Sequence, residues 1–367
     1  MKKFHRREFL KTASIAAAAA GTATIISCSN EKQNESAAIN TKKNYEWKMV
    51  TSWPPKFPIL GEYAEKIAEW IDEMSAGRLK IQVFGSGELV PAFEVFDAVS
   101  LGAAEMGHAA AYYWAGKTPS AQFFASVPFG MTARQMNAWL YFGGGIELWR
   151  DLYADFNLIP FPSGNTGGQM GGWYNREINS VSDLKGLKIR MPGLGGKVIT
   201  KAGATTILSP AGELYTNLER GVIDGLEWIG PYHDYLMGFH KITKYYYYPG
   251  WHEPGSTLEL ITNKDAYNKL PDDLKNIVTI AAKASNDLIL AAFDMKNTEY
   301  YYKLKDEENM DFREFPEEVL SKLKIYADTV IGEISGSDKM SKKIYESYNK
   351  FHKNINHWYR ISERNYS

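Results

Sequence analysis

Arg190 is the residue of this 367-residue sequence whose surroundings most clearly indicate a chemical role. It ends the run Leu187–Arg190, which is typical of a short strand, and the turn Met191-Pro192-Gly193 follows it. An arginine held at the end of a strand presents a planar guanidinium, which can pair with a carboxylate through two hydrogen bonds at once. The sequence therefore predicts that Arg190 binds a small organic acid.

Three other segments carry side chains that could share a site with Arg190, namely Gln169, the pair Glu227-Trp228, and Glu253. Each lies close to glycine or proline in a stretch rich in polar and aromatic residues, and none places a nucleophile beside a general base. The sequence also lacks a Gly-x-Ser-x-Gly elbow and a phosphate-binding glycine loop. We therefore expect a protein that binds its acid without transforming it. A purely structural ion pair between Arg190 and Glu227 is the alternative for the arginine.

The first 27 residues resemble an export signal. Arg6-Arg7 forms a twin-arginine run, and the weakly apolar stretch 12–27 that follows has 16 residues, fewer than the roughly 20 that a membrane-spanning helix needs. This stretch ends in Ile25-Ile26-Ser27-Cys28, which resembles a lipobox with Cys28 as the lipidated first residue of the mature chain. We expect export by the twin-arginine route and a lipid anchor at Cys28. Simple cleavage beside a chance cysteine is the alternative.

The composition of residues 28–367 limits the class of protein. Their 37 Lys and Arg face 42 Asp and Glu, a net charge of −5, which argues against nucleic acid as a partner. Cys28 is the only cysteine, so no disulfide within the chain can stabilise the fold. Residues 28–44 are polar and predict a flexible tether, and the remaining length suffices for two domains.

Strand and helix patterns alternate from Tyr45 onward, which predicts an α/β fold. Such a βαβ start implies a largely parallel sheet with right-handed crossovers, whose ligands bind beyond the carboxyl ends of the strands. The aromatic cluster Tyr112-Tyr113-Trp114 follows one of these strands, so Tyr112 and Tyr113 are candidates for the wall of the site, or for the core. The predicted strands of this first part are 45–52, 79–84 and 105–110, and the predicted helices are 60–74 and 91–101.

A second set of elements begins near Phe161. It predicts strands over 169–174, 187–190, 206–208, 225–229, 245–249 and 258–262, and helices over 195–202 and 212–221. Long helical patterns then occupy 272–302 and 317–359, the latter amphipathic in its first part. We expect domain I to comprise 45–165 plus 252–367, with the C-terminal helices, and domain II to comprise 166–251. The ligand cleft would lie between these mixed-sheet domains, as in periplasmic binding proteins.

Four segments in this order resemble the extracytoplasmic solute receptors of tripartite ATP-independent periplasmic (TRAP) transporters, the DctP family. The resemblance covers the chain from about Tyr45 to the C-terminal helices, and it is closest to the branch that binds pyruvate-like 2-oxo acids or lactate-like 2-hydroxy acids. The lipobox-like sequence at Cys28 is a departure from the family, because most of these receptors do not have one. The four segments are Gly164–Trp173, Asp183–Gly193, Arg220–Trp228 and Tyr245–Gly255.

The resemblance implies roles for the residues at matching positions. Arg190 would bind the ligand carboxylate, and Gln169, Glu227 and Trp228 would line the same site. A Na⁺ or Ca²⁺ ion would bridge protein and ligand through Gln169, Glu227, the Trp228 carbonyl and Glu253. Oxygen donors of this kind suit a hard cation, and a 2-oxo acid offers a chelating pair of oxygens. Asn165 would also contact the ligand, or simply form the turn.

The resemblance further implies delivery of the acid to the membrane subunits of a TRAP permease, without an organic cofactor. A ligand-sensing partner of a membrane receptor, and a periplasmic metal-dependent enzyme with Glu227, Glu253 and His252 as acid and base groups, are the alternatives. The other histidines are expected to be structural or solvated, as is His252 in the leading interpretation. The region 317–359 could pack on its own chain or on a partner, so the sequence leaves a monomer and a homodimer as alternatives.

Overall fold

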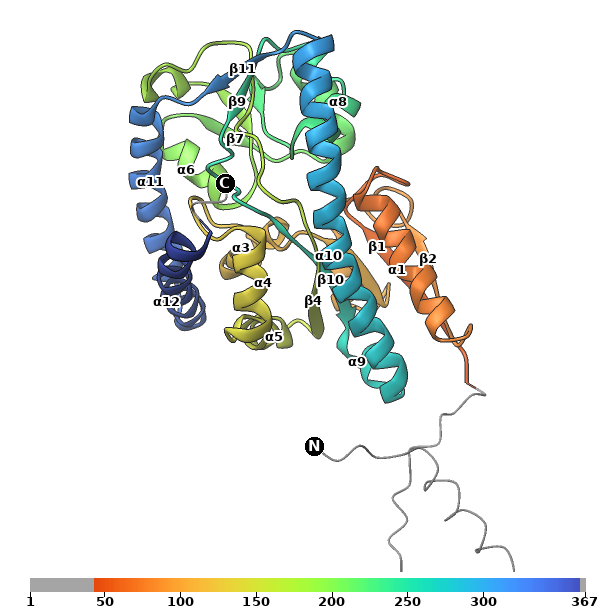
Figure 1. The fold of residues 1–367 in the computed structure, drawn as a ribbon. Helices are drawn as coiled ribbons and strands as arrows, with labels where there is room; N and C mark the ends of the chain where they lie inside the picture. Colours follow the sequence, from red (N-terminus) through yellow and green to blue (C-terminus); the bar gives the residue numbers. More distant parts are fainter. Residues whose placement is uncertain (1–42, 364–367) are drawn as a thin grey trace, which may run out of the picture. The chain divides into compact units, whose positions relative to one another are not determined.

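A computed structural model describes residues 43–363, which belong to one compact unit (Figure 1). The predicted export signal, Cys28 and nearly all of the tether lie outside the described residues. Within the described part of the chain, no helix combines the length and the apolar character needed to cross a membrane. The α/β prediction is confirmed, because the chain forms two mixed sheets flanked by helices.

The first sheet contains the predicted βαβ start. Its order is β2-β1-β3-β10-β4, with β1 parallel to β2 and β3, and β10 antiparallel to β3 and β4. Its strands and crossover helices are β1 (Tyr45–Thr51), α1 (Leu60–Met74), β2 (Leu79–Phe84), α2 (Val95–Ser100), β3 (Met106–Ala109), β4 (Leu158–Asn165) and β10 (Thr257–Asn263). Strand β10 lies between β3 and β4 although it follows β3 by about 150 residues, so the chain leaves this sheet and returns to it.

The second sheet holds the segments expected to carry the site. Its order is β11-β9-β5-β8-β6-β7, in which β6 runs parallel to both β7 and β8. Parallel neighbours end at the same edge, so residues after β6 and β8 are brought together. Its elements are β5 (Gly172–Tyr174), β6 (Lys188–Arg190), α6 (Gly193–Lys201), β7 (Thr205–Ile207), α7 (Leu214–Glu219), β8 (Gly225–Leu226), α8 (Pro231–Leu236), β9 (Tyr245–Tyr248) and β11 (Asp311–Glu314).

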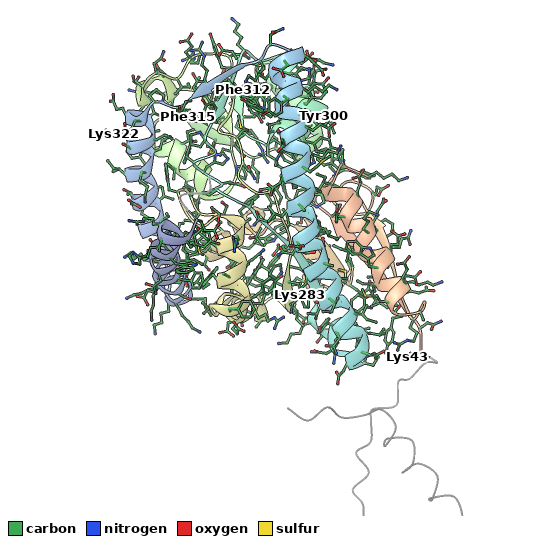
Figure 2. All side chains as sticks on the ribbon, viewed as in Figure 1. Lys43, Lys283, Tyr300, Phe312, Phe315 and Lys322 are labelled. Carbon is green, nitrogen blue, oxygen red and sulfur yellow. The ribbon has the colours of Figure 1, made fainter. Side chains whose placement is uncertain are left out.

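Strand β11 joins the second sheet, although the predicted boundaries assign residues 311–314 to domain I. It pairs in parallel with β9, the tyrosine-rich strand whose Tyr246 and Tyr247 are buried. Phe312 packs on Tyr246 with ring centroids 5.5 Å apart, and Phe315 on Tyr247 at 4.7 Å. Phe312 and Phe315 are labelled in Figure 2. These aromatic contacts explain why a strand so late in the sequence pairs here. The division into two domains at residues 165 and 251 remains a prediction.

Helices cover both sheets, and they differ from the sequence prediction in several places, one of which is the unpredicted helix α8. The region 317–359, predicted as one helical stretch, is two helices, because the Asp338 carboxylate accepts the Ser341 amide hydrogen at 2.8 Å and begins a new one. Two short helices before β4 were missed, because glycines interrupt their periodicity. The helices are α4 (Ala133–Phe142), α5 (Gly145–Ala154), α10 (Asp272–Tyr302), α11 (Glu317–Ser335) and α12 (Lys339–Ser362).

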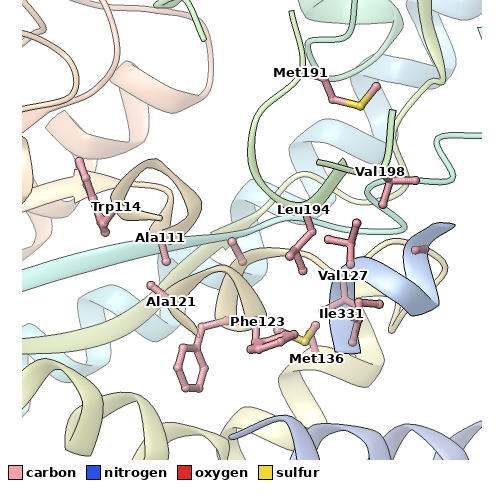
Figure 3. Close-up of a cluster of buried hydrophobic side chains, with 14 of the residues drawn as sticks. Ala111, Trp114, Ala121, Phe123, Val127, Met136, Met191, Leu194, Val198 and Ile331 are labelled. Carbon is pink, nitrogen blue, oxygen red and sulfur yellow. The ribbon is translucent and has the colours of Figure 1, made fainter. Parts of the chain in front are cut away.

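One hydrophobic cluster joins elements of both sheets. Trp114 and Phe123, which follow β3, share it with Leu194 and Val198 of α6 and with Ile331 of α11 (Figure 3). Protein interiors are close-packed and have low compressibility, so one element of such a cluster cannot shift without displacing its neighbours. Elements that precede and follow the candidate site residues therefore pack against one another in this structure.

Glu259 on β10 is a buried acid outside the candidate site. It accepts hydrogen bonds from the Trp114 indole and, at 2.9 Å, from the Tyr153 hydroxyl, and burial raises its pKa from 4.5 to about 7. Between pH 4.5 and about pH 7, the folded protein therefore binds more protons than the unfolded chain. The free energy of unfolding falls by about 3 kcal/mol as the pH rises through this range.

Glu259→Gln should remove this loss, because an amide does not ionise. We expect the melting temperature of the variant, relative to wild type, to rise by several degrees between about pH 5 and about pH 8.5. Thermal unfolding of both proteins across this range is the measurement. A difference that does not change with pH would show that Glu259 does not keep its proton in the folded state.

Candidate functional site

Arg190 lies at the end of β6 with 1 % of its side chain exposed. The parallel register of β6 and β8 sets Arg190 beside Leu226, so Glu227 follows at the same edge. The Arg190 Nη1 atom donates to Glu227 Oε1 and to the Glu227 carbonyl, each at 2.7 Å. Its Nε is buried and has no partner among the described residues. The ion pair considered for Arg190 is therefore present, yet part of the guanidinium is free to bind an anion.

Trp228 covers the guanidinium from one side. The Arg190 Cζ lies 4.9 Å from the centroid of its indole ring, a cation–π arrangement. The indole N–H donates to His233 Nδ1 at 3.3 Å, and the other ring nitrogen of His233 lies 2.8 Å from the Pro58 carbonyl. Burial lowers the pKa of His233 to about 3, so its ring is neutral and can accept this hydrogen bond. His233 thus fixes the orientation of the Trp228 indole, whose ring face lies over Arg190.

Gln169 and Glu253 meet where two distant segments run side by side. The backbone N–H of Gln169 donates to the backbone carbonyl of Glu253 at 3.3 Å, and the backbone N–H of Gly250 donates to the backbone carbonyl of Gln169 at 3.0 Å. Any Cβ at Gly250 would lie only 2.2 Å from that carbonyl oxygen, so glycine is required for this approach. The Gln169 Nε2 donates to Glu253 Oε2 at 2.8 Å and to Thr166 Oγ1 at 3.0 Å. This leaves Gln169 Oε1 buried without a partner among the described residues.

His252 lies in the cluster, although the leading sequence interpretation treated it as structural or solvated and only the enzyme alternative placed it beside Glu227 and Glu253. His252 is buried, and its Nε2 lies 3.0 Å from Glu227 Oε2, which links the segment of Glu253 to the carboxylate that Arg190 binds. Glu227, His252 and Glu253 each offer one ligand atom, and these atoms lie within 4.8 Å of one another. The only sequence signal was adjacency to Glu253, since a lone histidine in a turn shows no periodicity.

The charges in this cluster are unbalanced. Two buried carboxylates, Glu227 and Glu253, face one guanidinium, and the binding of an acid would add a further negative charge. Burial, followed by repulsion from Glu227, raises the pKa of Glu253 to about 7. A cation at this place would relieve both effects, because it offsets the cost of burying the second carboxylate.

The donor set fits a hard cation. Gln169 Oε1 is an unpartnered amide oxygen beside Glu253, and the carboxylates of Glu227 and Glu253 supply further oxygens. Sodium and calcium take such oxygens. The Nε2 of His252 is already directed at a Glu227 oxygen, so the ring orients a ligand and leaves oxygens as the donors.

Tyr112 and Tyr113 lie in a short 3₁₀ helix (Ala111–Trp114) after β3, where the sequence placed a candidate wall of the site. Their rings are 4.9 Å apart, and a Cβ built on Gly193, the first residue of α6, would lie 3.2 Å from Tyr112 Cβ. Burial raises the pKa of both hydroxyls, that of Tyr113 to about 12, and the charges of Glu253 and Glu227 act in the same direction. Both hydroxyls are therefore protonated donors beside the charged cluster.

Asn165 lies at the end of β4 and is buried. Its Oδ1 accepts the Gly167 amide hydrogen at 3.0 Å, and its Nδ2 donates to Thr257 Oγ1 at 3.2 Å. These bonds close the turn that leads from the first sheet to Gln169. The structure thus gives Asn165 the turn-forming role that the sequence left as an alternative, and a ligand contact for it remains a prediction.

Comparisons with known proteins agree with this chemistry. Residues 49–336 match the model of the family described as bacterial extracellular solute-binding protein, family 7. A protein from Nostoc sp. described as a monocarboxylate 2-oxoacid-binding periplasmic protein is 42% identical over 363 residues, which are 98% of this chain and 97% of the relative.

Two solved structures are similar over 88% of this chain. One is a TRAP periplasmic solute-binding protein from Pseudoalteromonas atlantica with bound sodium and pyruvate, at 42% identity and a TM-score of 0.86, with 98% of that chain covered. The other is a TRAP periplasmic solute-binding protein from Colwellia psychrerythraea with bound calcium and pyruvate, at 45% identity and a TM-score of 0.86, with 99% covered. The family resemblance seen in the sequence is thereby confirmed.

Proposed function

This chain belongs to the bacterial extracellular solute-binding proteins of family 7, the solute receptors of TRAP transporters, and from this we propose that it captures a pyruvate-like 2-oxo monocarboxylate together with Na⁺ or Ca²⁺. The observation that carries the proposal is the unbalanced cluster at the ends of β6 and β8. One buried guanidinium with an unpartnered N–H faces two buried carboxylates and an unpartnered amide oxygen.

Arg190 and the cation would divide the work of recognition. The guanidinium pairs with the carboxylate of the ligand, and charge-assisted hydrogen bonds of this kind contribute roughly 1.5–3 kcal/mol each. Gln169, Glu227, Glu253 and the Trp228 carbonyl would hold the ion, which when bound supplies a Lewis-acidic contact for the 2-oxo oxygen. Tyr112, Tyr113 and Trp228 would enclose the remainder of the ligand and exclude water.

This division explains why a 2-oxo acid is preferred to a simple carboxylic acid. A ligand without an oxygen at carbon 2 satisfies Arg190 but leaves the cation without its second contact. A 2-hydroxy acid such as lactate offers a neutral hydroxyl at the same position and is the alternative ligand. The Arg190 interaction would select a carboxylic acid, and the cation would select the oxygen substituent at carbon 2.

The family is extracytoplasmic, and the finer points of delivery are part of this proposal. Export through the twin-arginine route, an acyl anchor at Cys28 and transfer of the acid to TRAP permease subunits follow from the N-terminal sequence and from the family. The packing of α12 against α4 and α5 of its own chain accounts for the C-terminal helix without a partner. A homodimer therefore has to rest on other surfaces or on an exchange of this helix.

Isothermal titration calorimetry with pyruvate, lactate and propionate tests the ligand and the cation together. We expect pyruvate to bind most tightly, and exhaustive chelation with exchange of sodium for a large organic cation to weaken it by at least tenfold. Added sodium or calcium should restore the affinity. Pyruvate binding that is unchanged after removal of both ions would refute the cation, and equal affinity for propionate would refute recognition of the 2-oxo group.

A further inference from the structure

The C-terminal helix α12 carries a concentration of positive charge that ligand capture does not use. Its six Lys and Arg residues face a single acid, Glu346, within the helix. Residues 28–338, by contrast, contain 30 Lys and Arg against 40 Asp and Glu. The protein is therefore strongly polarised, with an acidic body and one basic helix.

The cations of α12 share one face. At 100° per residue, all six fall within an arc of about 100°. This arc lies opposite Ile344 and Tyr348, which α12 buries against its own chain, so the basic face is directed to solvent. The six residues are Lys339, Lys342, Lys343, Lys350, Lys353 and Arg360.

Four of these six cations, Lys339, Lys350, Lys353 and Arg360, form no ion pair in the described part of the chain. Lys342 lies 3.9 Å from Glu346, and Lys343 lies 3.2 Å from Asp151, both as exposed pairs that solvent weakens. A solvated face needs no such excess of one sign, since mixed charges keep a helix equally soluble.

The last turns of α12 also expose two large apolar side chains beside these cations. Trp358 is 59 % exposed and Ile361 is 65 % exposed. Tryptophan and isoleucine next to lysine and arginine suit the interface of a membrane, where the apolar groups enter the headgroup region and the cations contact lipid phosphates. An acidic protein surface would satisfy the charges but offers no evident place for both apolar groups.

A groove of about 580 Å³ lies between α11 and α12 at this edge. Lys353, His357 and Arg360 line it from α12, and Lys324 lines it from α11. Its only acid, Asp328, is paired with Lys324. A phosphate-bearing headgroup therefore finds unpaired cations and no uncompensated negative charge there.

We propose that the basic face of α12 binds the surface of an anionic phospholipid membrane. The acidic body is repelled from such a surface while α12 is attracted, so the charge asymmetry also sets which side of the receptor faces the lipid. Each cation near an anionic membrane is worth on the order of fivefold in partitioning, and the attraction is screened by salt. The interaction is weak enough to leave the receptor mobile along the membrane.

Vesicle cosedimentation of the full chain tests the proposal, with Cys28→Ser in every protein so that no acyl chain contributes. We expect vesicles of mixed phosphatidylglycerol and phosphatidylcholine to bind more protein than vesicles of phosphatidylcholine alone at low salt, and the difference to disappear near 0.5 M salt, where the Debye length is only about 4 Å. The leader carries five Lys and Arg of its own, so its binding to anionic vesicles is common to all variants, and only the difference between variants measures the contribution of α12.

The triple variant Lys350→Glu/Lys353→Glu/Arg360→Glu should lose at least a hundredfold of the anionic partitioning. The matched control is Lys185→Glu/Lys197→Glu/Lys244→Glu, which changes the net charge equally at exposed positions far from α12 in the sequence, and it should retain partitioning within about threefold. Pyruvate calorimetry on both triple variants checks that the fold and the ligand site are intact.

Three results would overturn the proposal. The first is equal binding to anionic and neutral vesicles, and the second is an equal loss in both triple variants, which would make net charge the cause. The third is binding of polyglutamate that depends on the α12 cations while anionic vesicles bind no protein, which would assign the face to an acidic protein. Trp358→Ala should further weaken vesicle binding without affecting the salt dependence.

Discussion

Arg190→Met is expected to reduce the affinity for pyruvate by about 10²- to 10⁴-fold. The estimate follows from the loss of two charge-assisted hydrogen bonds at roughly 1.5–3 kcal/mol each. Methionine keeps most of the volume and can still pack under Trp228, but it offers no donor to a carboxylate. Calorimetric titration with pyruvate in saturating sodium measures the effect.

The same substitution should lower stability, and this has to be separated from the loss of binding. Arg190 compensates the buried carboxylate of Glu227, and removal of one partner of a buried ion pair costs about 3–5 kcal/mol. The double variant Arg190→Met/Glu227→Gln removes the uncompensated charge and should recover much of the stability without recovering pyruvate binding. If this double variant folds and binds pyruvate as wild type does, Arg190 is only a structural residue.

Arg220→Met is the matched control for the arginine, because Arg220 is exposed at the end of α7. Its affinity for pyruvate and its melting temperature should equal those of wild type. Arg190→Lys adds a further distinction. It keeps the charge but loses the planar fork, so binding that is weakened yet measurable would show that the geometry of the guanidinium matters as well as its charge.

Glu253→Gln is expected to weaken the binding of the cation by at least tenfold and to reduce pyruvate affinity with it. The substitution keeps an oxygen for Gln169 to donate to, but it removes one of two carboxylates that would hold the ion. A hard divalent or monovalent cation loses a charged oxygen ligand in exchange for a neutral one. Titration with calcium in the absence of pyruvate, then with pyruvate at fixed calcium, measures both effects.

Stability should move in the opposite direction in this variant when no ion is present. Glu253 is buried beside Glu227, and their mutual repulsion is removed by the neutral amide. We therefore expect the ion-free Glu253→Gln protein to melt at or above the temperature of the ion-free wild type. A variant that is destabilised and still binds calcium normally would show that Glu253 has a structural role instead.

Glu259→Gln supplies the control for this experiment. It replaces another buried glutamate in the same part of the chain, whose partners are Trp114 and Tyr153 and not the cluster at Arg190. Its affinities for calcium and pyruvate should match those of wild type. The comparison separates the loss of a cation ligand from the general effect of neutralising a buried acid.

The structure joins two interpretations of Arg190 that the sequence set against each other. The guanidinium is a partner of Glu227 through Nη1, and its Nε has no partner among the described residues. An arginine that is already oriented by a protein carboxylate loses less conformational freedom when it binds a second one. The structural ion pair would thus orient Arg190 for the ligand proposed above.

The chemistry of the site could be predicted from sequence because it depends on residue type and on strand ends. Arg190 and Glu227 follow neighbouring parallel strands, so the βα pattern alone places them at one edge. The run Tyr245–Tyr248 forms the predicted strand, because aromatic residues favour sheets, but only Tyr246 and Tyr247 are buried and Tyr248 is 38 % exposed. Local sequence patterns determine these strands, and the pairing of the strands determines which residues lie next to each other at their ends.

Only the tertiary structure decided which loop residues meet. Gln169 and Glu253 are separated by 84 residues, and their contact depends on Gly250, which lets two backbones approach where no periodic pattern marks the place. His252 joins Glu227 through the same approach, which is why the leading interpretation of the sequence did not place it in the site. The imbalance of one arginine against two buried carboxylates exists only once these loops are packed together, because burial and distance, and not residue type, set the energy of a charge.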